Sequence, residues 1–208
     1  MQPRQTKFNE EITFNSRHLH NLLDAGYQNT NKAKQIGLEN GYMLDEELSN
    51  RNHRVFRDKH DNSILVYTGS RTAGDFLITD PLLAVGLGRL TPRFNQSVEL
   101  VDKVKKKYKN NKIVALGHSL GGSLAEYVNN QRPNDINKVI SVNKGTGILF
   151  NRLRPNHVDI RTKTDPVSFL SNLQGGGRKF EIPDSFLIRP VRSHGYYNLK
   201  KFDKKLRF

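Results

Sequence analysis

Ser119 lies in a pattern that is typical of a catalytic serine. It is the central residue of GHSLG, with Gly117 two positions before it and Gly121 two positions after it. The aliphatic run IVAL precedes this pattern and the helix-like run SLAEYVNN follows it. Glycines at these positions let the backbone turn sharply between a strand and a helix, and the N-terminus of that helix favours negative charge beside the serine. The pattern predicts a nucleophile elbow; the alternative is a glycine-rich turn with an incidental serine.

A nucleophilic serine needs a histidine to take its proton and an acid to orient that histidine. In chains with this kind of elbow the order is serine, acid, histidine. Two histidines follow the elbow, His157 and His194. The candidate acids are Asp135, Asp159, Asp165 and Asp184. Asp135 is the acid open to His157, and the other three are open to His194. We expect His118, beside the serine, to support the elbow.

Asp165 is the preferred acid and Asp184 the next choice. Asp165 directly follows the expected strand 157–162, and catalytic groups collect at the carboxyl ends of strands in open α/β sheets. Pro166 restrains the backbone at this point. His194 then becomes the preferred base, although a lone histidine is also typical of an ordinary surface. No H-E-x-x-H or similar cluster occurs, so no metal site is expected.

The periodicity of the remaining sequence indicates the elements that must position these residues. The expected helices are 16–30, with Asn15 or Ser16 as its cap, 33–44, which is weaker, and 97–111. The expected strands are 53–58, 63–68, 112–116, 138–143 and 157–162. The first two strands form a hairpin through KHDN, and the later strands alternate with helices. This order predicts an α/β fold with a mostly parallel sheet covered on both faces.

The composition predicts one soluble domain that meets anionic partners. The chain has 208 residues, a formal net charge of +14 and no cysteine, which excludes disulfides and thiolate metal sites. Residues 1–15 are expected to be a flexible arm, and residues 198–208 a basic tail. Neither a signal peptide nor a membrane-spanning stretch is seen, so cytoplasmic and virion-associated locations both stay open. Anionic lipid and nucleic acid are the partner classes that the charge favours.

These residues together resemble the class 3 lipase family of α/β-hydrolases, which includes fungal triacylglycerol lipases and plant phospholipases A1. RVFRDKHDNSILVYTGS resembles the strand, turn and strand that lead to the family's F-R-G-[ST] motif, and GDFLITD resembles its D-W-x-x-D segment. IVALGHSLGGSLAEY matches the elbow, TDPVSFL the acid motif and SHGYY the histidine region. The similarity extends roughly from residue 53 to residue 197. Thr68 and Phe76 depart from the family's usual arginine and tryptophan.

The resemblance implies a single-domain α/β-hydrolase in which Ser119 is the nucleophile, Asp165 the orienting acid and His194 the general base. It also implies an oxyanion hole formed by Ser70 and the backbone N–H of Leu120. The lid that follows the oxyanion serine in this family corresponds here to residues from about 71 to 94. Its apolar members are Phe76, Leu77, Ile78, Leu82, Leu83, Val85 and Leu87. A connector packed on the core is the alternative interpretation of this segment.

The expected function is hydrolysis of a lipid carboxyl ester through an acyl-enzyme on Ser119, without a cofactor. Phospholipase activity of the A1 type, at a membrane surface that carries negative charge, is favoured over hydrolysis of neutral oil because the chain is basic. One alternative is a catalytically vestigial module that binds a membrane or, less favoured, nucleic acid. Another alternative is a soluble short-chain esterase.

Overall fold

The structure is a computed structural model of the chain. The residues that it describes are 12–69, 92–109, 111–145, 152–165, 168, 171, 173–183 and 195–201. The α-helices are α1 (Ser16–Tyr27), α2 (Thr30–Glu39), α5 (Pro92–Lys107) and α6 (Leu120–Gln131), and η3 (Tyr196–Lys201) is a 3-10 helix. The strands are β1 (Met43–Asn50), β2 (His53–Arg57), β3 (Ser63–Tyr67), β4 (Ile113–His118), β5 (Lys138–Val142), β6 (Leu153–Thr162) and β7 (Gly176–Ile182).

Within this part of the chain the strands form one seven-stranded sheet, whose spatial order is the same as the order in the sequence. β1, β2 and β3 pair antiparallel, and β3 to β7 pair parallel. The predicted hairpin and the predicted mostly parallel sheet are both confirmed. Because the later strands are parallel, their carboxyl ends all lie on one edge of the sheet, where side chains from β4, β5, β6 and β7 can meet.

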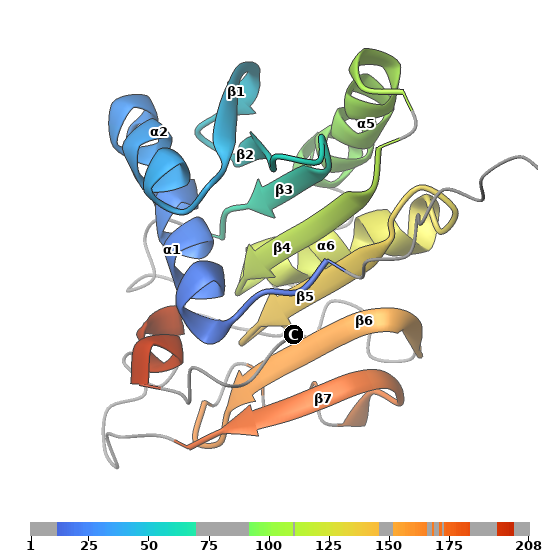
Figure 1. Cartoon of the computed structure of the whole chain (residues 1–208). Coiled ribbons are helices and arrows are strands. Elements are labelled where there is room, and N and C mark those ends of the chain that lie inside the picture. The colour runs from blue at the N-terminus through green and yellow to red at the C-terminus, as the bar shows by residue number, and fades with distance from the viewer. Residues whose placement is uncertain are drawn as a thin grey trace, which may run out of the picture.

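Helices cover both faces of the sheet (Figure 1), and each face has its own apolar core. On one face Leu19 and Leu22 of α1 pack with strand residues such as Leu116. On the other face Val101 of α5 and Leu124 of α6 pack with Ala115, the neighbour of Leu116 on the same strand. This alternation of neighbouring residues between two cores explains why the central strands β3 and β4 are buried at every residue.

The first helix begins at the predicted place for a local reason. The Asn15 side chain accepts a hydrogen bond from the backbone N–H of His18 at 2.8 Å, which satisfies one of the donors that a helix N-terminus leaves without a partner. Leu19, Leu22 and Leu23 then face the sheet and are fully buried. The prediction of a helix capped at this position is confirmed.

The second predicted helix and the two edge strands required correction. α2 ends at Glu39, and residues 43–44, predicted to be helical, belong to β1. β1 and β7 were not predicted. Each is an edge strand with a single buried residue, and its charged residues hide the alternation of apolar and polar residues that identifies a strand. The helix expected over 97–111 begins earlier, at Pro92.

The packed part of the chain extends into the ranges expected to be an arm and a tail. Phe14 is fully buried in the core beneath α1, and Leu199 of η3 is fully buried in the same core. Among the helices in the described ranges, none combines the length and the apolar character that crossing a membrane requires.

Candidate functional site

Ser119 occupies a strained backbone position between the last residue of β4 and the first residue of α6. Its φ is 55° and its ψ is −127°, a conformation that costs a non-glycine residue about 1–3 kcal/mol. Its N–H donates to the carbonyl oxygen of Val142 at 3.0 Å, and its own carbonyl oxygen accepts from the N–H of Gly122 at 2.9 Å. These bonds hold the turn, so the half-buried Ser119 side chain lies at the carboxyl edge of the parallel strands.

The glycines around Ser119 are required by close backbone contacts. A Cβ on Gly117 would lie 2.1 Å from the carbonyl carbon and oxygen of Gly121, and a Cβ on Gly121 would lie 2.1 Å from the carbonyl oxygen of Tyr67. Sequence reasoning missed a third position, Gly122, where a Cβ would lie 2.8 Å from the Cβ of Lys144. The available signal was the second of two consecutive glycines, Gly121 and Gly122, directly after the GHSLG pattern.

The end of β3 reaches the elbow through Gly69. A Cβ on Gly69 would lie 3.0 Å from the carbonyl oxygen of His118 and 3.4 Å from the Cβ of Ser119. The Gly69 N–H donates to the hydroxyl of Tyr27 at 2.8 Å, so α1 fixes the backbone at this point. Leu120 is the first residue of α6, where a backbone N–H has no acceptor within the helix.

Several predicted residues lie outside the described part of the chain. These are Ser70, His194, Asp184 and the expected lid residues Phe76, Leu77, Ile78, Leu82 and Leu83. The described residues that flank 70–91 are in contact, because Arg93 of α5 donates from Nη2 to the carbonyl oxygen of Thr68 at 2.6 Å.

Asp165 is buried in the turn after β6. Its N–H donates to the carbonyl oxygen of Thr162 at 3.1 Å, and its Oδ2 accepts from the N–H of Ser168 at 3.0 Å. β6 is separated from β4 by β5 alone and all three strands are parallel, so Asp165 follows the same sheet edge as Ser119. Its role in orienting His194 stays a prediction, because His194 lies outside the described residues.

An aromatic cluster brings the C-terminal segment next to the elbow. The rings of Tyr196 and His118 meet edge to face with centroids 5.2 Å apart, and Tyr196 stacks on Tyr27 at 5.8 Å. The Tyr196 hydroxyl also donates to Asp24 at 3.2 Å. Tyr196 is two residues after His194, the predicted base. Its contact with His118 therefore places the chain close to Ser119 at this point. His118 thus packs between Tyr27 of α1 and Tyr196 of η3.

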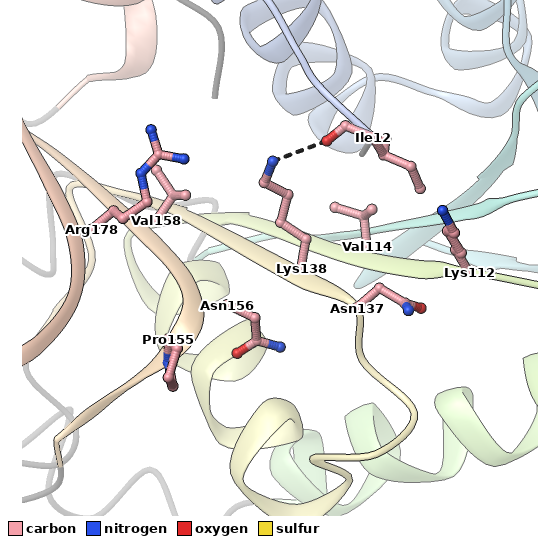
Figure 2. A pocket seen from close by; sticks show the side chains of 9 residues that line it. All are labelled: Ile12, Lys112, Val114, Asn137, Lys138, Pro155, Asn156, Val158 and Arg178. Atoms are coloured by element: carbon pink, nitrogen blue, oxygen red, sulfur yellow. Dashed lines mark hydrogen bonds between the residues drawn. The ribbon is translucent and has the colours of Figure 1, made fainter. Parts of the chain in front are cut away.

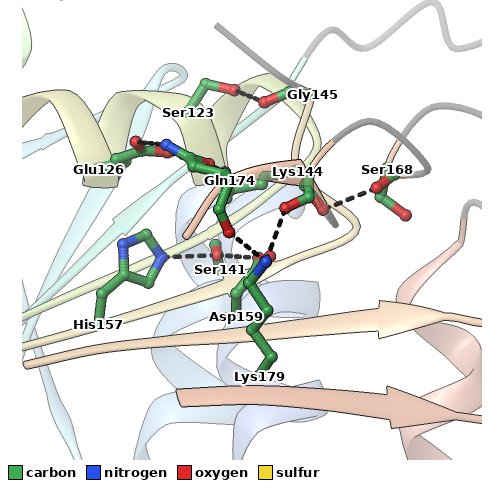
Figure 3. A network of polar contacts seen from close by, with 11 residues as sticks. Ser123, Glu126, Ser141, Lys144, Gly145, His157, Asp159, Ser168, Gln174 and Lys179 are labelled. Atoms are coloured by element: carbon green, nitrogen blue, oxygen red, sulfur yellow. Dashed lines mark hydrogen bonds and ion pairs between the residues drawn. The ribbon is translucent and has the colours of Figure 1, made fainter. Parts of the chain in front are cut away.

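A buried polar triangle lies beneath the elbow helix (Figure 3). Lys144, which follows β5, pairs with Glu126 of α6 at 2.9 Å and donates to Oε1 of Gln174 at 2.5 Å. Gln174 in turn donates from Nε2 to Glu126 at 2.5 Å. All three side chains are buried, and together they tie α6 to the segment that leads into β7. Lys179 of β7 adds a bond from its Nζ to the carbonyl oxygen of Gln174.

Ser141, His157 and Asp159 form a second hydrogen-bonded set, on β5 and β6. The Ser141 hydroxyl donates to Asp159 at 2.6 Å, so its oxygen accepts from Nε2 of His157 at 2.8 Å. In a catalytic triad the bonds run the other way: the histidine accepts from the serine and donates to the acid. All three residues are buried, and burial holds the pKa of His157 well below its usual range. This set is therefore a structural network of the sheet.

The structure shows the contacts of three of the residues that the sequence left open as alternatives. The His157 ring is bonded to Ser141, and Asp135, the acid that would have served it, pairs with Lys105 at 3.2 Å. Asp159 accepts the hydroxyl of Ser141 on the neighbouring strand (Figure 3). In the ranges described, no group of three or more His, Asp or Glu residues is arranged to hold a metal ion.

Solved structures of fungal lipases share this fold. A structure in which a serine protease triad forms the catalytic centre of a triacylglycerol lipase is 16% identical, with a TM-score of 0.56 over 81% of this chain and 79% of that one. Lip2 lipase from Yarrowia lipolytica is 16% identical, with a TM-score of 0.56 over 85% and 80%. Rhizomucor miehei triacylglyceride lipase is 14% identical, with a TM-score of 0.52 over 81% and 79%.

Comparisons of the sequence alone find no related family or protein: no protein-family model matches the chain, and no curated protein matches it significantly. At identities of 14–16% the structural similarity is informative about the fold alone. The similarity confirms the architecture that the class 3 lipase motifs implied: the chain has the α/β-hydrolase fold of the fungal lipases.

Proposed function

We propose that the protein is a serine carboxyl-ester hydrolase that acts on lipid, with Ser119 as its nucleophile. The observation that carries the proposal is the backbone of Ser119, held at a positive φ between β4 and α6 by glycines that no other residue could replace. Strain of this kind persists where a function depends on it, because the surrounding structure must offset its cost. The lipase fold supports the same conclusion.

In the proposed reaction the Ser119 hydroxyl attacks the ester carbonyl carbon while His194 takes the proton. Asp165 orients His194 and stabilises its charged form. The oxyanion that develops accepts hydrogen bonds from the backbone N–H of Leu120 and from Ser70, which follows the Gly69 backbone packed against Ser119. His194 then protonates the leaving alcohol, and water releases the fatty acid from the acyl-enzyme by the same steps. The reaction requires no cofactor.

The favoured substrates are phospholipids in an anionic membrane, cleaved in the manner of an A1-type phospholipase. The support for this choice is the formal net charge of +14, because basic residues near an anionic bilayer each contribute about 1 kcal/mol of attraction. The apolar residues between 76 and 87 would contact lipid if that segment acts as a lid; the expected lid cannot extend to Phe94, which is buried in α5. Peripheral attachment to a membrane surface would then bring substrate and site together.

The test compares wild type with Ser119→Ala and with Ser141→Ala, a matched control at a buried serine whose hydroxyl contacts His157 and Asp159. Each protein is incubated with vesicles of phosphatidylcholine, phosphatidylglycerol and triacylglycerol, and mass spectrometry identifies the products. We expect fatty acid and lysophospholipid from wild type, a loss of at least about 10³-fold in Ser119→Ala, and retained activity in folded Ser141→Ala.

Labelling with a fluorophosphonate should add mass to the peptide that contains Ser119. Activity that survives in Ser119→Ala and disappears in folded Ser141→Ala would assign catalysis to the buried set and contradict the proposal. If no variant releases fatty acid from vesicles or from short-chain esters although all bind the vesicles, the chain is a binding module with a hydrolase fold. Hydrolysis of short-chain esters alone would indicate a soluble esterase.

A further inference from the structure

The C-terminal end of α1 is held against the carboxyl edge of the parallel strands. Gly26 packs so closely on β3 that a Cβ there would lie 3.0 Å from Cγ1 of Val66. Directly after the helix, the carbonyl oxygen of Gln28 accepts from Nη2 of Arg54 on β2 at 2.7 Å. Tyr27 lies between these two anchored residues, so its half-buried side chain has a fixed place near the elbow.

The Tyr27 hydroxyl meets two of the segments that form the proposed catalytic site. It accepts from the N–H of Gly69 at 2.8 Å, and Gly69 directly precedes the proposed oxyanion residue Ser70. It also lies 3.4 Å from Nδ1 of His118, which directly precedes Ser119. A hydroxyl accepts and donates, so it can bond to both neighbours when His118 carries its proton on Nε2. The same oxygen atom therefore links the end of β3 to the elbow.

The Tyr27 ring meets the segment that follows the predicted base. It stacks on the ring of Tyr196, with centroids 5.8 Å apart and an interplanar angle of 16°. The Tyr196 hydroxyl donates to Asp24, one turn earlier on α1, at 3.2 Å. α1 thus holds both the ring and the hydroxyl of Tyr196, which lies two residues after His194 in the sequence.

We propose that Tyr27 is a positioning residue for ester hydrolysis at Ser119; this inference rests on the function proposed above. The hydroxyl fixes the backbone of Gly69, and the ring fixes Tyr196. Small displacements of an oxyanion donor or of the base slow the chemical step more than they weaken substrate binding, because these groups act on the transition state. In this mechanism Tyr27 acts through Gly69, His118 and Tyr196, and not on the substrate itself.

Steady-state kinetics of wild type and Tyr27→Phe test the inference. The variant keeps the ring that stacks on Tyr196 and removes the hydroxyl. Tyr108→Phe is the matched control, because the Tyr108 hydroxyl donates to Asp45 at 2.5 Å and Tyr108 lies between α5 and β4, at the amino edge of the sheet. The probes are p-nitrophenyl butyrate in solution and phosphatidylglycerol vesicles. We expect Tyr27→Phe to lower kcat about tenfold or more with KM changed by less than about twofold, and Tyr108→Phe to change neither.

Two further measurements separate positioning from a general loss of stability. Urea midpoints should fall by similar amounts in Tyr27→Phe and Tyr108→Phe, since each variant loses the hydrogen bonds of one hydroxyl. Tyr196→Leu removes the stacking partner of Tyr27, so it tests the inference even if Tyr27→Phe fails to fold. We expect this variant also to lower kcat with KM nearly unchanged.

The outcomes distinguish the inference from the proposed function. If wild type is active and Ser119→Ala is not, but Tyr27→Phe and Tyr196→Leu keep the kcat of wild type, the inference alone is overturned. Equal losses of kcat in Tyr27→Phe and Tyr108→Phe would overturn it too, because stability and not position would be the cause. An inactive wild type, or full activity in Ser119→Ala, would contradict the proposed function and the inference together.

Discussion

At the scale of single residues, the elbow depends on the absence of a side chain at Gly117. An added methyl group would lie 2.1 Å from the backbone of Gly121, and neither backbone can move without disturbing Ser119. We expect Gly117→Ala to lower the free energy of unfolding by about 3 kcal/mol or more, because overpacking against backbone has no cheap relief. Urea denaturation measures this change.

Gly175→Ala is the control for the glycine prediction. A Cβ at that position would meet the Arg152 side chain at 3.4 Å, an ordinary contact with a flexible group. Its effect on unfolding should stay within about 1 kcal/mol. Equal effects of the two substitutions would mean that the close contact at the elbow is not the cause.

His157 makes the stability of the fold depend on pH. Its pKa is held below the ordinary value of 6.5, first by burial and then by the charge of Lys144. Below pH 6.5 the unfolded chain takes up a proton at this residue and the folded chain does not, so acidification favours unfolding. From pH 6.5 to 5.5 wild type should lose up to about 1 kcal/mol more stability than His157→Gln, which keeps an N–H donor for Ser141. Parallel losses measured by urea denaturation would contradict this role.

At the scale of elements, the triangle of Lys144, Glu126 and Gln174 joins α6 to the segment before β7. Glu126→Gln would leave the Lys144 ammonium buried without its carboxylate, which costs about 3–5 kcal/mol. The double variant Lys144→Met/Glu126→Leu should be closer to wild type than Lys144→Met or Glu126→Leu alone, because an apolar pair has no desolvation penalty. Urea denaturation of wild type, these two single variants and the double variant gives the coupling. A cost below about 1 kcal/mol for Glu126→Gln would mean that solvent reaches the pair.

Elements could be predicted from the sequence where their signal is local. The run from β4 through Ser119 to α6 is contiguous, and glycine positions, aliphatic strand and amphipathic helix all indicate the same turn. β1 and β7 could not be predicted, because an edge strand is defined by its one neighbour and its own sequence is charged. The burial of Lys144 could not be predicted, since its partners Glu126 and Gln174 are distant in sequence.

At the scale of the whole molecule, the sheet separates two kinds of chemistry. The carboxyl edge of the parallel strands carries the strained serine and the buried Asp165, and the amino edge carries a separate cavity lined by Lys112, Lys138 and Arg178 (Figure 2). Parallel pairing makes this separation unavoidable, because each strand presents different residues at its two ends. Residues at the amino edge can therefore be substituted without altering the elbow.

The charge of the whole molecule predicts how it meets a membrane. With 34 basic and 20 acidic residues, attraction to an anionic surface is long-range at low salt and is screened as the Debye length falls from about 10 Å at 0.1 M to about 3 Å at 1 M. We expect tight sedimentation with phosphatidylglycerol vesicles at 0.05 M salt, at least about tenfold weaker binding at 0.5 M, and little binding to phosphatidylcholine alone. Ser119→Ala should behave like wild type, since this attraction needs no catalysis. Binding that ignores both salt and lipid charge would show that apolar contacts, and not the basic surface, hold the protein on the membrane.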